Sequence, residues 1–243
     1  MMRGQSFNAI LAIVAKDMRT YYLKAPAISW GIVFPVTWIL AFYLRHPSGF
    51  AELIPGLIAM TALFSTTAAE AVVINFELRL GALERLLLAP VRFSMVFLAK
   101  VLAGALFGLL MSAVVTTGVV LAMSIPVNIA QLFLIVILSL VSFAGLGAFL
   151  CVLVTEVFDA QTLLNFPRFV MIFLSGVVYP VSALPAPLQV FARFFPLTYT
   201  VEGLRSAFFA PQWNIVSLDL LALLGFTLFF LVLGMRRFSG RFE

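Results

Sequence analysis

Charged side chains are rare in this chain, and a group of them lies in one short segment between two apolar stretches. The segment from 75 to 92 reads NFELRLGALERLLLAPVR. The flanking stretches 53–69 and 101–155 carry no charged residue. A charged, amphipathic segment between membrane-spanning stretches is a surface on which another protein can push. It is therefore the best candidate for a functional site.

The residue types that catalysis needs do not form a recognisable pattern. We find no G-x-x-x-x-G-K-[ST] phosphate loop and no nucleophile with a nearby base in the sequence. The single cysteine, Cys151, lies in an apolar run and is read as a small core residue. The single histidine, His46, stands beside Pro47 and is read as a solvated turn residue. We expect no enzymatic activity, metal or cofactor in this chain, so energy from ATP must come from another chain.

Composition indicates a polytopic α-helical membrane protein. Hydrophobic residues make up 63% of the 243 residues and charged residues 10%, and the mean hydropathy is +1.15. A soluble domain needs only about half apolar residues to fill its core. Several uncharged stretches approach or exceed the ~20 residues that cross the hydrocarbon layer as a helix. The short alternating segments of a membrane β-barrel are not seen.

The chain is expected to form one all-α membrane domain over residues 1–243, with six transmembrane helices. Residues 1–24 combine apolar positions at helical spacing with five charges, which predicts an amphipathic helix on the membrane surface. The stretch 185–211 is apolar but broken by prolines, and is interpreted as a re-entrant helical hairpin, with an interfacial loop helix as the alternative. The predicted spans are 25–44, 54–75, 93–123, 129–154, 162–181 and 215–234.

The lysines and arginines of the short connections predict the orientation. With the N-terminus inside, the inner segments hold ten of these residues: Arg3, Lys16, Arg19, Lys24, Arg79, Arg85, Arg92, Arg236, Arg237 and Arg241. The outer segments hold three: Arg45, Arg193 and Arg205. Both termini and the connection 76–92 are therefore expected in the cytoplasm.

Three charges within the predicted spans are functional candidates because burying a charge in lipid is costly. Glu70 and Lys100 are expected at similar depth, and we predict that they pair. The alternative is that Lys100 snorkels to the head groups while Glu70 faces a watery vestibule. Arg168 is interpreted as a snorkelling anchor on anionic lipid. Asp219, at the start of the sixth span, is expected to be solvated.

Small residues in two of the spans indicate close helix packing. Gly104 and Gly108 form a G-x-x-x-G pattern in the third span, and Gly145 and Gly147 lie in the fourth. Packing is favoured here over a role in binding substrate.

The segment 76–92 itself predicts a helix from Glu77 to Leu88, with a bend permitted by Gly81 and an end imposed by Pro90. The charged side chains Glu77, Glu84 and Arg85 are expected to be exposed. Leucines at helical spacing would face the membrane or a partner: Leu80, Leu83, Leu87 and Leu88. Periodicity alone fits a simple surface connector equally well.

The order of these elements resembles the type-2 ATP-binding-cassette (ABC) transporter permeases, which include exporters of drugs, antibiotics and polysaccharides. The run from Glu77 to Arg85 that closes on LAPV (88–91) is similar to the signature loop of that family. The segment FLAKVL (97–102) resembles the start of its third span. GVVYP (176–180) and FPLTY (195–199) resemble the exit of its fifth span and its outer hairpin. The likeness covers nearly the whole chain.

The resemblance implies that the loop after the second span is a coupling helix seated in a cleft of the ATPase subunit. Its contact residues would then be Glu77, Arg79, Gly81, Leu83, Glu84 and Arg85. A second, smaller contact is expected at Glu156 and Asp159, and Phe191, Phe194 and Phe195 are expected to shape an outer gate. Expected partners are two ABC ATPase subunits that bind ATP and Mg, a second permease copy in a homodimer, and membrane lipids, with no nucleic acid.

We therefore predict the permease subunit of an ATP-driven exporter in a bacterial or archaeal inner or plasma membrane. Its cargo would be hydrophobic or amphiphilic, such as a drug, an antibiotic or a lipid. The alternatives are a lipid-linked polysaccharide exporter of the same family, a stand-alone secondary transporter or channel, and a non-transporting membrane component. Secondary transporters usually show several midplane charges or matched broken helices, which this sequence lacks.

Overall fold

A computed structural model shows an all-helical protein in which 86% of residues are helical. It describes the chain except for residues 1, 46–48, 84–90, 124–125 and 242–243, and the described residues contain no β-strand. Six helices are long and apolar enough to cross a membrane, which confirms the predicted class and number of spans. They cover Ala25–Leu44, Phe50–Arg79, Phe93–Ala122, Ile129–Leu153, Val157–Leu174 and Val216–Ser239.

The first span is irregular just before Pro35, the proline in its interior. It consists of α2 (Ala25–Ile28), the π-helical turn η2 (Ser29–Val33) and α3 (Phe34–Arg45). Pro35 lies just after the π-helical turn. Proline has no N–H to donate, and its ring clashes with the carbonyl four residues earlier, so a wider turn before it relieves the conflict.

The second span is also divided, and it is the most buried of the six. Its first part is α4 (Phe50–Thr67), followed by a turn at Ala68 and Ala69. Its second part passes through the π-helical turn η4 (Val72–Phe76) into the short α5 (Glu77–Arg79). The predicted span 54–75 therefore extends by about a turn at each end, and α5 continues it directly.

The third and fourth spans are long, regular helices. They are α7 (Phe93–Met123) and α8 (Ile129–Leu153). The Asn128 side chain caps α8 by accepting a hydrogen bond from the Gln131 N–H at 3.1 Å. This cap comes two residues after Pro126 and starts α8 as a helix separate from α7.

The fifth span, α9 (Val157–Leu174), begins and ends earlier than the predicted 162–181. Gly176 has a φ of +84°. This left-handed conformation favours glycine and ends the helix. The short turn η5 (Val181–Ala183) follows, and the predicted outer segment 185–211 forms two helices, α10 (Ala186–Ala192) and α11 (Pro196–Phe209). The sixth span is α12 (Trp213–Ser239).

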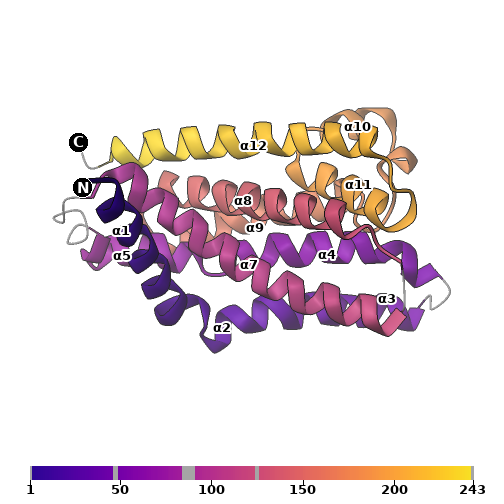
Figure 1. Ribbon diagram of the computed structural model, residues 1–243, viewed down its shortest axis with the longest axis horizontal. Helices are drawn as coiled ribbons and strands as arrows, with labels where there is room; N and C mark the ends of the chain where they lie inside the picture. Colours follow the sequence, from indigo (N-terminus) through magenta and orange to yellow (C-terminus); the bar gives the residue numbers. More distant parts are fainter. Residues whose placement is uncertain (1, 46–48, 84–90, 124–125, 242–243) are drawn as a thin grey trace.

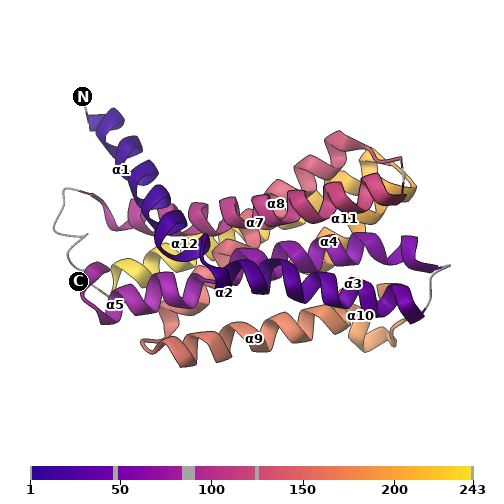
Figure 2. The same ribbon diagram turned by 90° about the horizontal axis from the view of Figure 1, so that it is seen from below.

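The long helices run side by side along the longest axis (Figure 1). One end of the bundle carries α10 and α11, and the other carries both termini and α5. The helix α1 (Met2–Asp17) leaves the bundle at an angle (Figure 2), and it contacts α7. The helices α4 and α8 are the most buried. A displacement of α5, which continues the second span, would therefore act directly on the core.

Candidate functional site

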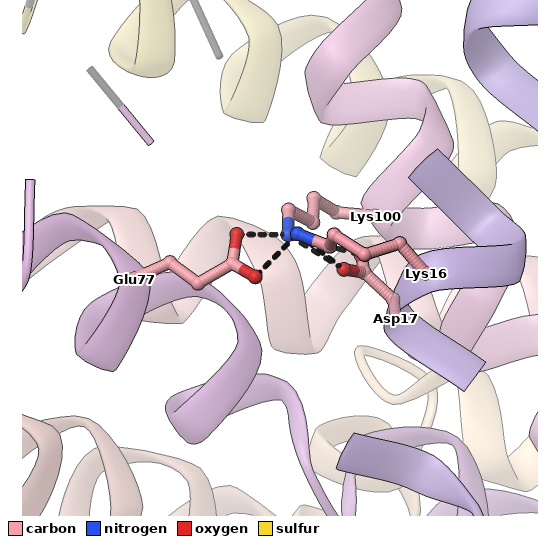
Figure 3. A network of polar contacts seen from close by, with 4 residues as sticks. All are labelled: Lys16, Asp17, Glu77 and Lys100. Carbon is pink, nitrogen blue, oxygen red and sulfur yellow. Dashed lines mark hydrogen bonds and ion pairs between the residues drawn. The ribbon is translucent and has the colours of Figure 1, made fainter. Parts of the chain in front are cut away.

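Four charged side chains from three separate elements meet at the α5 end of the bundle (Figure 3). The ammonium of Lys100, on α7, lies 2.6 Å from Glu77 Oε2 and 3.0 Å from Asp17 Oδ2. Lys16 Nζ lies 2.9 Å from Asp17 Oδ1 and also pairs with Glu77. We call these four residues the ion cluster. It joins α1, the coupling segment and the third span.

The ion cluster is balanced in charge and mostly buried. Asp17, Glu77 and Lys100 are each 2% exposed or less, whereas the Lys16 side chain is 41% exposed. Burial lowers the pKa of Lys16, but the hydrogen bonds and charges of Glu77 and Asp17 outweigh this and raise it above 10.5. Because a lone buried charge is strongly destabilising, each of these groups requires the others.

The predicted pair of Glu70 with Lys100 is wrong. Lys100 bonds to Glu77 and Asp17 instead. The prediction placed two groups at similar depth but did not consider the end of α1, which supplies the second carboxylate. The expectation that Glu77 is exposed is also wrong, for the same reason.

Glu70 is held between three spans at two glycines. A Cβ added at Gly147 of α8 would overlap Glu70 Oε2, and a Cβ at Gly104 of α7 would lie 3.1 Å from both Glu70 Oε1 and Tyr22 Oη. Neither carboxyl oxygen has a hydrogen-bond partner among the described residues. Close packing at these glycines is thus confirmed, and its effect is to make room for a carboxyl group. The watery vestibule that was the alternative for Glu70 is not seen, because Glu70 is 1% exposed.

Arg168 does not snorkel to the membrane surface as predicted. It is 4% exposed and points into the bundle. Its Nη2 donates to the Thr67 carbonyl at 2.6 Å, and its Nη1 donates to Asn165 Oδ1 at 2.8 Å. Thr67 is the last residue of α4 before the turn at Ala68 and Ala69. Arg168 therefore satisfies a backbone carbonyl at the point where the second span is divided.

The coupling segment turns sharply after α5. Gly81 has a φ of +65°, so the chain bends at Gly81, as its glycine was expected to permit. Ala82 and Leu83 are helical again, and the rest of the helix predicted from Glu77 to Leu88 lies outside the described residues. Leu83 is 1% exposed and packs into the core, whereas Leu80 is 57% exposed. Two of the predicted contact residues, Glu84 and Arg85, lie outside the described residues.

The two predicted contact regions form one surface. Arg79 Nη1 lies 3.1 Å from Glu156 Oε2, and both side chains are more than half exposed. Glu156 is the residue before α9, and Asp159 is exposed in its first turn. Leu80 lies next to Arg79 and is also exposed. Arg79, Leu80, Glu156 and Asp159 are called the contact surface below.

The end of α8 is tied to the second span and to the C-terminal segment. Asn75 Nδ2 donates to the carbonyls of Cys151 at 2.9 Å and Val154 at 2.8 Å. Arg241 Nη1 donates to the carbonyls of Val152 and Val154 at 2.9 Å each. The last carbonyls of a helix have no partner within the helix. The side chains of Asn75 and Arg241 supply hydrogen-bond donors to these carbonyls.

The remaining predicted residues lie at the α10 end. Phe191 and Phe194 are exposed, and the Phe191 ring contacts Phe195 edge-on with centroids 5.1 Å apart. Their role as an outer gate stays a prediction. Asp219 was expected to be solvated, but it is 4% exposed.

The sequence reasoning missed Asp17 and Asn75. The signal for Asp17 was its place beside Lys16 near the apolar face of an amphipathic helix. Asn75 gave a weaker signal, as an amide at the end of an apolar span. Among the described residues, no group of three or more His, Cys, Asp or Glu side chains could hold a metal ion.

Comparison with known proteins identifies the class. The sequence model of the ABC-2 type transporter family matches residues 8–209. The chain therefore belongs to the ABC-2 type transporter family. The match includes the ion cluster and the contact surface.

Individual relatives agree with this assignment. The chain is 28% identical to ycf38 of Cyanophora paradoxa, named as a transport permease, over 75% of this chain and 68% of that protein. It is 27% identical to DrrC of Mycobacterium tuberculosis, named as a doxorubicin resistance ABC transporter permease, over 82% and 73%. It is 24% identical to YbhS of Escherichia coli, named as a multidrug ABC transporter permease, over 75% of this chain and half of that protein.

Proposed function

We propose that this chain is the membrane subunit of an ATP-driven exporter of hydrophobic or amphiphilic molecules. An ABC ATPase in a separate chain binds ATP and Mg and drives the change of shape. The membership in the ABC-2 family supports an ABC ATPase partner, and the names of YbhS and DrrC support drug-like cargo. The six apolar spans require a multi-pass position in a membrane.

The observation that carries the proposal is the ion cluster. Glu77 is the first residue of α5 and bonds to Lys100 on α7, while Asp17 and Lys16 bring α1 to the same point. A force applied to the segment after α5 is therefore transmitted at once to the second span, the third span and α1. A flexible surface connector would need no buried charges of this kind.

The contact surface is where we place the ATPase. It combines an exposed leucine with an ion pair whose charges both face out, and it includes parts of two connections. Glu77 and Leu83 act from beneath it, because their side chains are buried within this chain. Arg79, Leu80, Glu156 and Asp159 are exposed among the described residues and are free to touch the partner.

The assembly is proposed to contain two permease copies and two ATPases in a bacterial or archaeal inner or plasma membrane. The lysine and arginine distribution supports an arrangement in which both termini and the contact surface face the cytoplasm. Cargo would move from the cytoplasm or the inner leaflet to the outer side.

Cross-linking tests the proposed contact directly. Cys151 is the single cysteine, so a Cys151→Ala background allows one new cysteine at a time. A cysteine at Arg79 or Leu80 should cross-link to a co-expressed ABC ATPase from the same gene neighbourhood. A cysteine at Ser182, at the α10 end, is the matched control and should not. If the Ser182 position reacts with the ATPase and the Arg79 position does not, the proposal is overturned.

A further inference from the structure

A small polar cavity lies at the α10 end of the bundle, far from the ion cluster. It measures about 220 Å³ and lies between the end of α9, the turn η5 and α11. Its polar lining consists of Ser175, Ser182, Gln189, Arg193, Glu202 and Arg205. We call this cavity the polar cup.

The polar cup contains hydrogen-bonding groups that the protein does not use. Arg205 donates from Nη2 to the Gly176 carbonyl at 3.0 Å, but its buried Nε has no partner among the described residues. Ser175 is fully buried, and its hydroxyl also lacks a partner in the described part of the chain. Buried polar groups are normally satisfied. A guanidinium and a hydroxyl that remain available indicate a bound group that accepts hydrogen bonds.

The charges of the polar cup favour an anion. Two arginines face one carboxylate there, and that carboxylate, Glu202, pairs with Arg193. Arg205 forms no ion pair within 4 Å among the described residues, although Glu52 lies in the adjoining groove. A guanidinium presents several donors in a planar fork that matches phosphate oxygens.

An apolar groove continues from the polar cup. It measures about 670 Å³ and shares Pro180 and Arg205 with the cup. Its lining includes the apolar side chains of Leu53, Val178 and Phe209. A charged site for a head group that continues into an apolar groove is the arrangement expected of a phospholipid-binding site.

The position of the cup along the bundle agrees with this assignment. α9 ends at Leu174, one residue before Ser175, and α4 begins at Phe50, beside the groove residue Ala51. The ends of two spans place the cup where lipid head groups lie. Its volume is below the ~300–1,000 Å³ of sites for drug-sized molecules, so it holds a head group and not a whole drug.

We propose that the polar cup binds the phosphate head group of an anionic phospholipid, with its acyl chain in the adjoining groove. Arg205 donates to the phosphate oxygens, and the Ser175 hydroxyl donates a further hydrogen bond. The site lies within one copy of the chain and does not depend on the proposed ATPase contact.

The test measures lipid binding by native mass spectrometry in an uncharged maltoside detergent. Phosphatidylglycerol is titrated against the wild type, Arg205→Gln and Arg19→Gln; Arg19 is an exposed arginine just after α1 and lines neither the cup nor the groove. Arg205→Gln should weaken the affinity about tenfold, as expected for one charge-assisted contact. Arg19→Gln should leave it unchanged.

A second variant keeps the result meaningful if Arg205→Gln does not fold. Ser182 is exposed and lines the cup, so Ser182→Phe can fill the cavity without removing a buried contact. It should also weaken phosphatidylglycerol binding. Unchanged binding in Ser182→Phe, or equal binding of phosphatidylcholine and phosphatidylglycerol by the wild type, would overturn the proposal.

A competition arm distinguishes a lipid from a soluble anion. Glycerol 3-phosphate carries the same phosphate but has no acyl chain. It should displace phosphatidylglycerol only weakly. Displacement at matching concentration would show that the groove contributes nothing and that the cup is a site for free phosphate compounds, which contradicts the lipid assignment.

Discussion

Arg79 and Glu156 join two connections that are 77 residues apart in the chain, through an ion pair of 3.1 Å between Nη1 and Oε2. One residue ends α5 and the other precedes α9. The second and fifth spans are thus linked at their ends by a bond that faces away from the bundle. A partner that binds there touches both spans at once.

Reversing the charge of Arg79 or of Glu156 tests whether the pair contributes to ATPase binding rather than to the stability of the permease. Exposed ion pairs contribute only about 0.2–1 kcal/mol, so Arg79→Glu and Glu156→Arg should each leave the unfolding temperature in detergent almost unchanged. Each should reduce the amount of ABC ATPase that co-purifies with the permease. The double exchange should recover part of it if the pair shapes the contact surface. No recovery would show that the two residues act independently.

Removal of Lys100 should destabilise the protein strongly. Lys100→Met leaves Glu77 and Asp17 with one partly exposed lysine, and breaking a buried pair typically costs about 3–5 kcal/mol. Adding Glu77→Gln should restore part of the loss, which a double-mutant cycle measures by thermal unfolding. Adding Glu70→Gln is the control and should give no recovery. If Glu70→Gln restores stability and Glu77→Gln does not, the partner of Lys100 is Glu70 and the pairing with Glu77 is wrong.

Gly147 and Gly225 should respond in opposite ways to alanine. A Cβ at Gly147 overlaps the Glu70 carboxyl, whereas a Cβ at Gly225 of α12 meets nothing within 4 Å. Gly147→Ala should lower the stability by about 1–3 kcal/mol, as overpacked cores do. Gly225→Ala should be neutral or slightly stabilising because alanine favours a helix. Glu70→Ala in the same chain should relieve the Gly147→Ala defect, and failure to do so would contradict this packing.

Asn75→Ala should weaken the end of the fourth span. The change removes two hydrogen bonds to carbonyls of Cys151 and Val154, and a buried group without a partner costs about 1–3 kcal/mol. Hydrogen exchange of the amides around 147–154 should increase. Asn214→Ala, at an exposed site near the start of α12, is the matched control. Equal exchange in both variants would mean that Asn75 is not the cap.

The spans could be predicted because their lengths and apolar runs follow from the bilayer itself. The third span was predicted as 93–123, and α7 covers the same residues. The fifth span was shifted because Gly176 adopts a positive φ and ends α9, while the residues just before 162 include Asp159 and Gln161 but are still helical. Composition alone does not indicate where a backbone changes direction.

Charge pairing was harder to predict because it depends on how elements cross. Depth along the membrane suggested Glu70 for Lys100, but α1 crosses α7 and brings Asp17 there. Arg168 was interpreted as an anchor to lipid because it lies toward the inner end of the fifth span. Its true partner is the Thr67 carbonyl, a backbone group that no residue pattern reveals.

The turn at Ala68 and Ala69 gives the second span a joint inside the membrane. Above it, α4 is fixed among its neighbours; below it, a π-helical turn leads to the segment that we assign to the partner. Arg168 holds the last carbonyl before the joint from a different span. The hydrogen bond from Arg168 makes the fifth span a neighbour of this turn, so a displacement of the second span at the membrane surface would be shared with the fifth span.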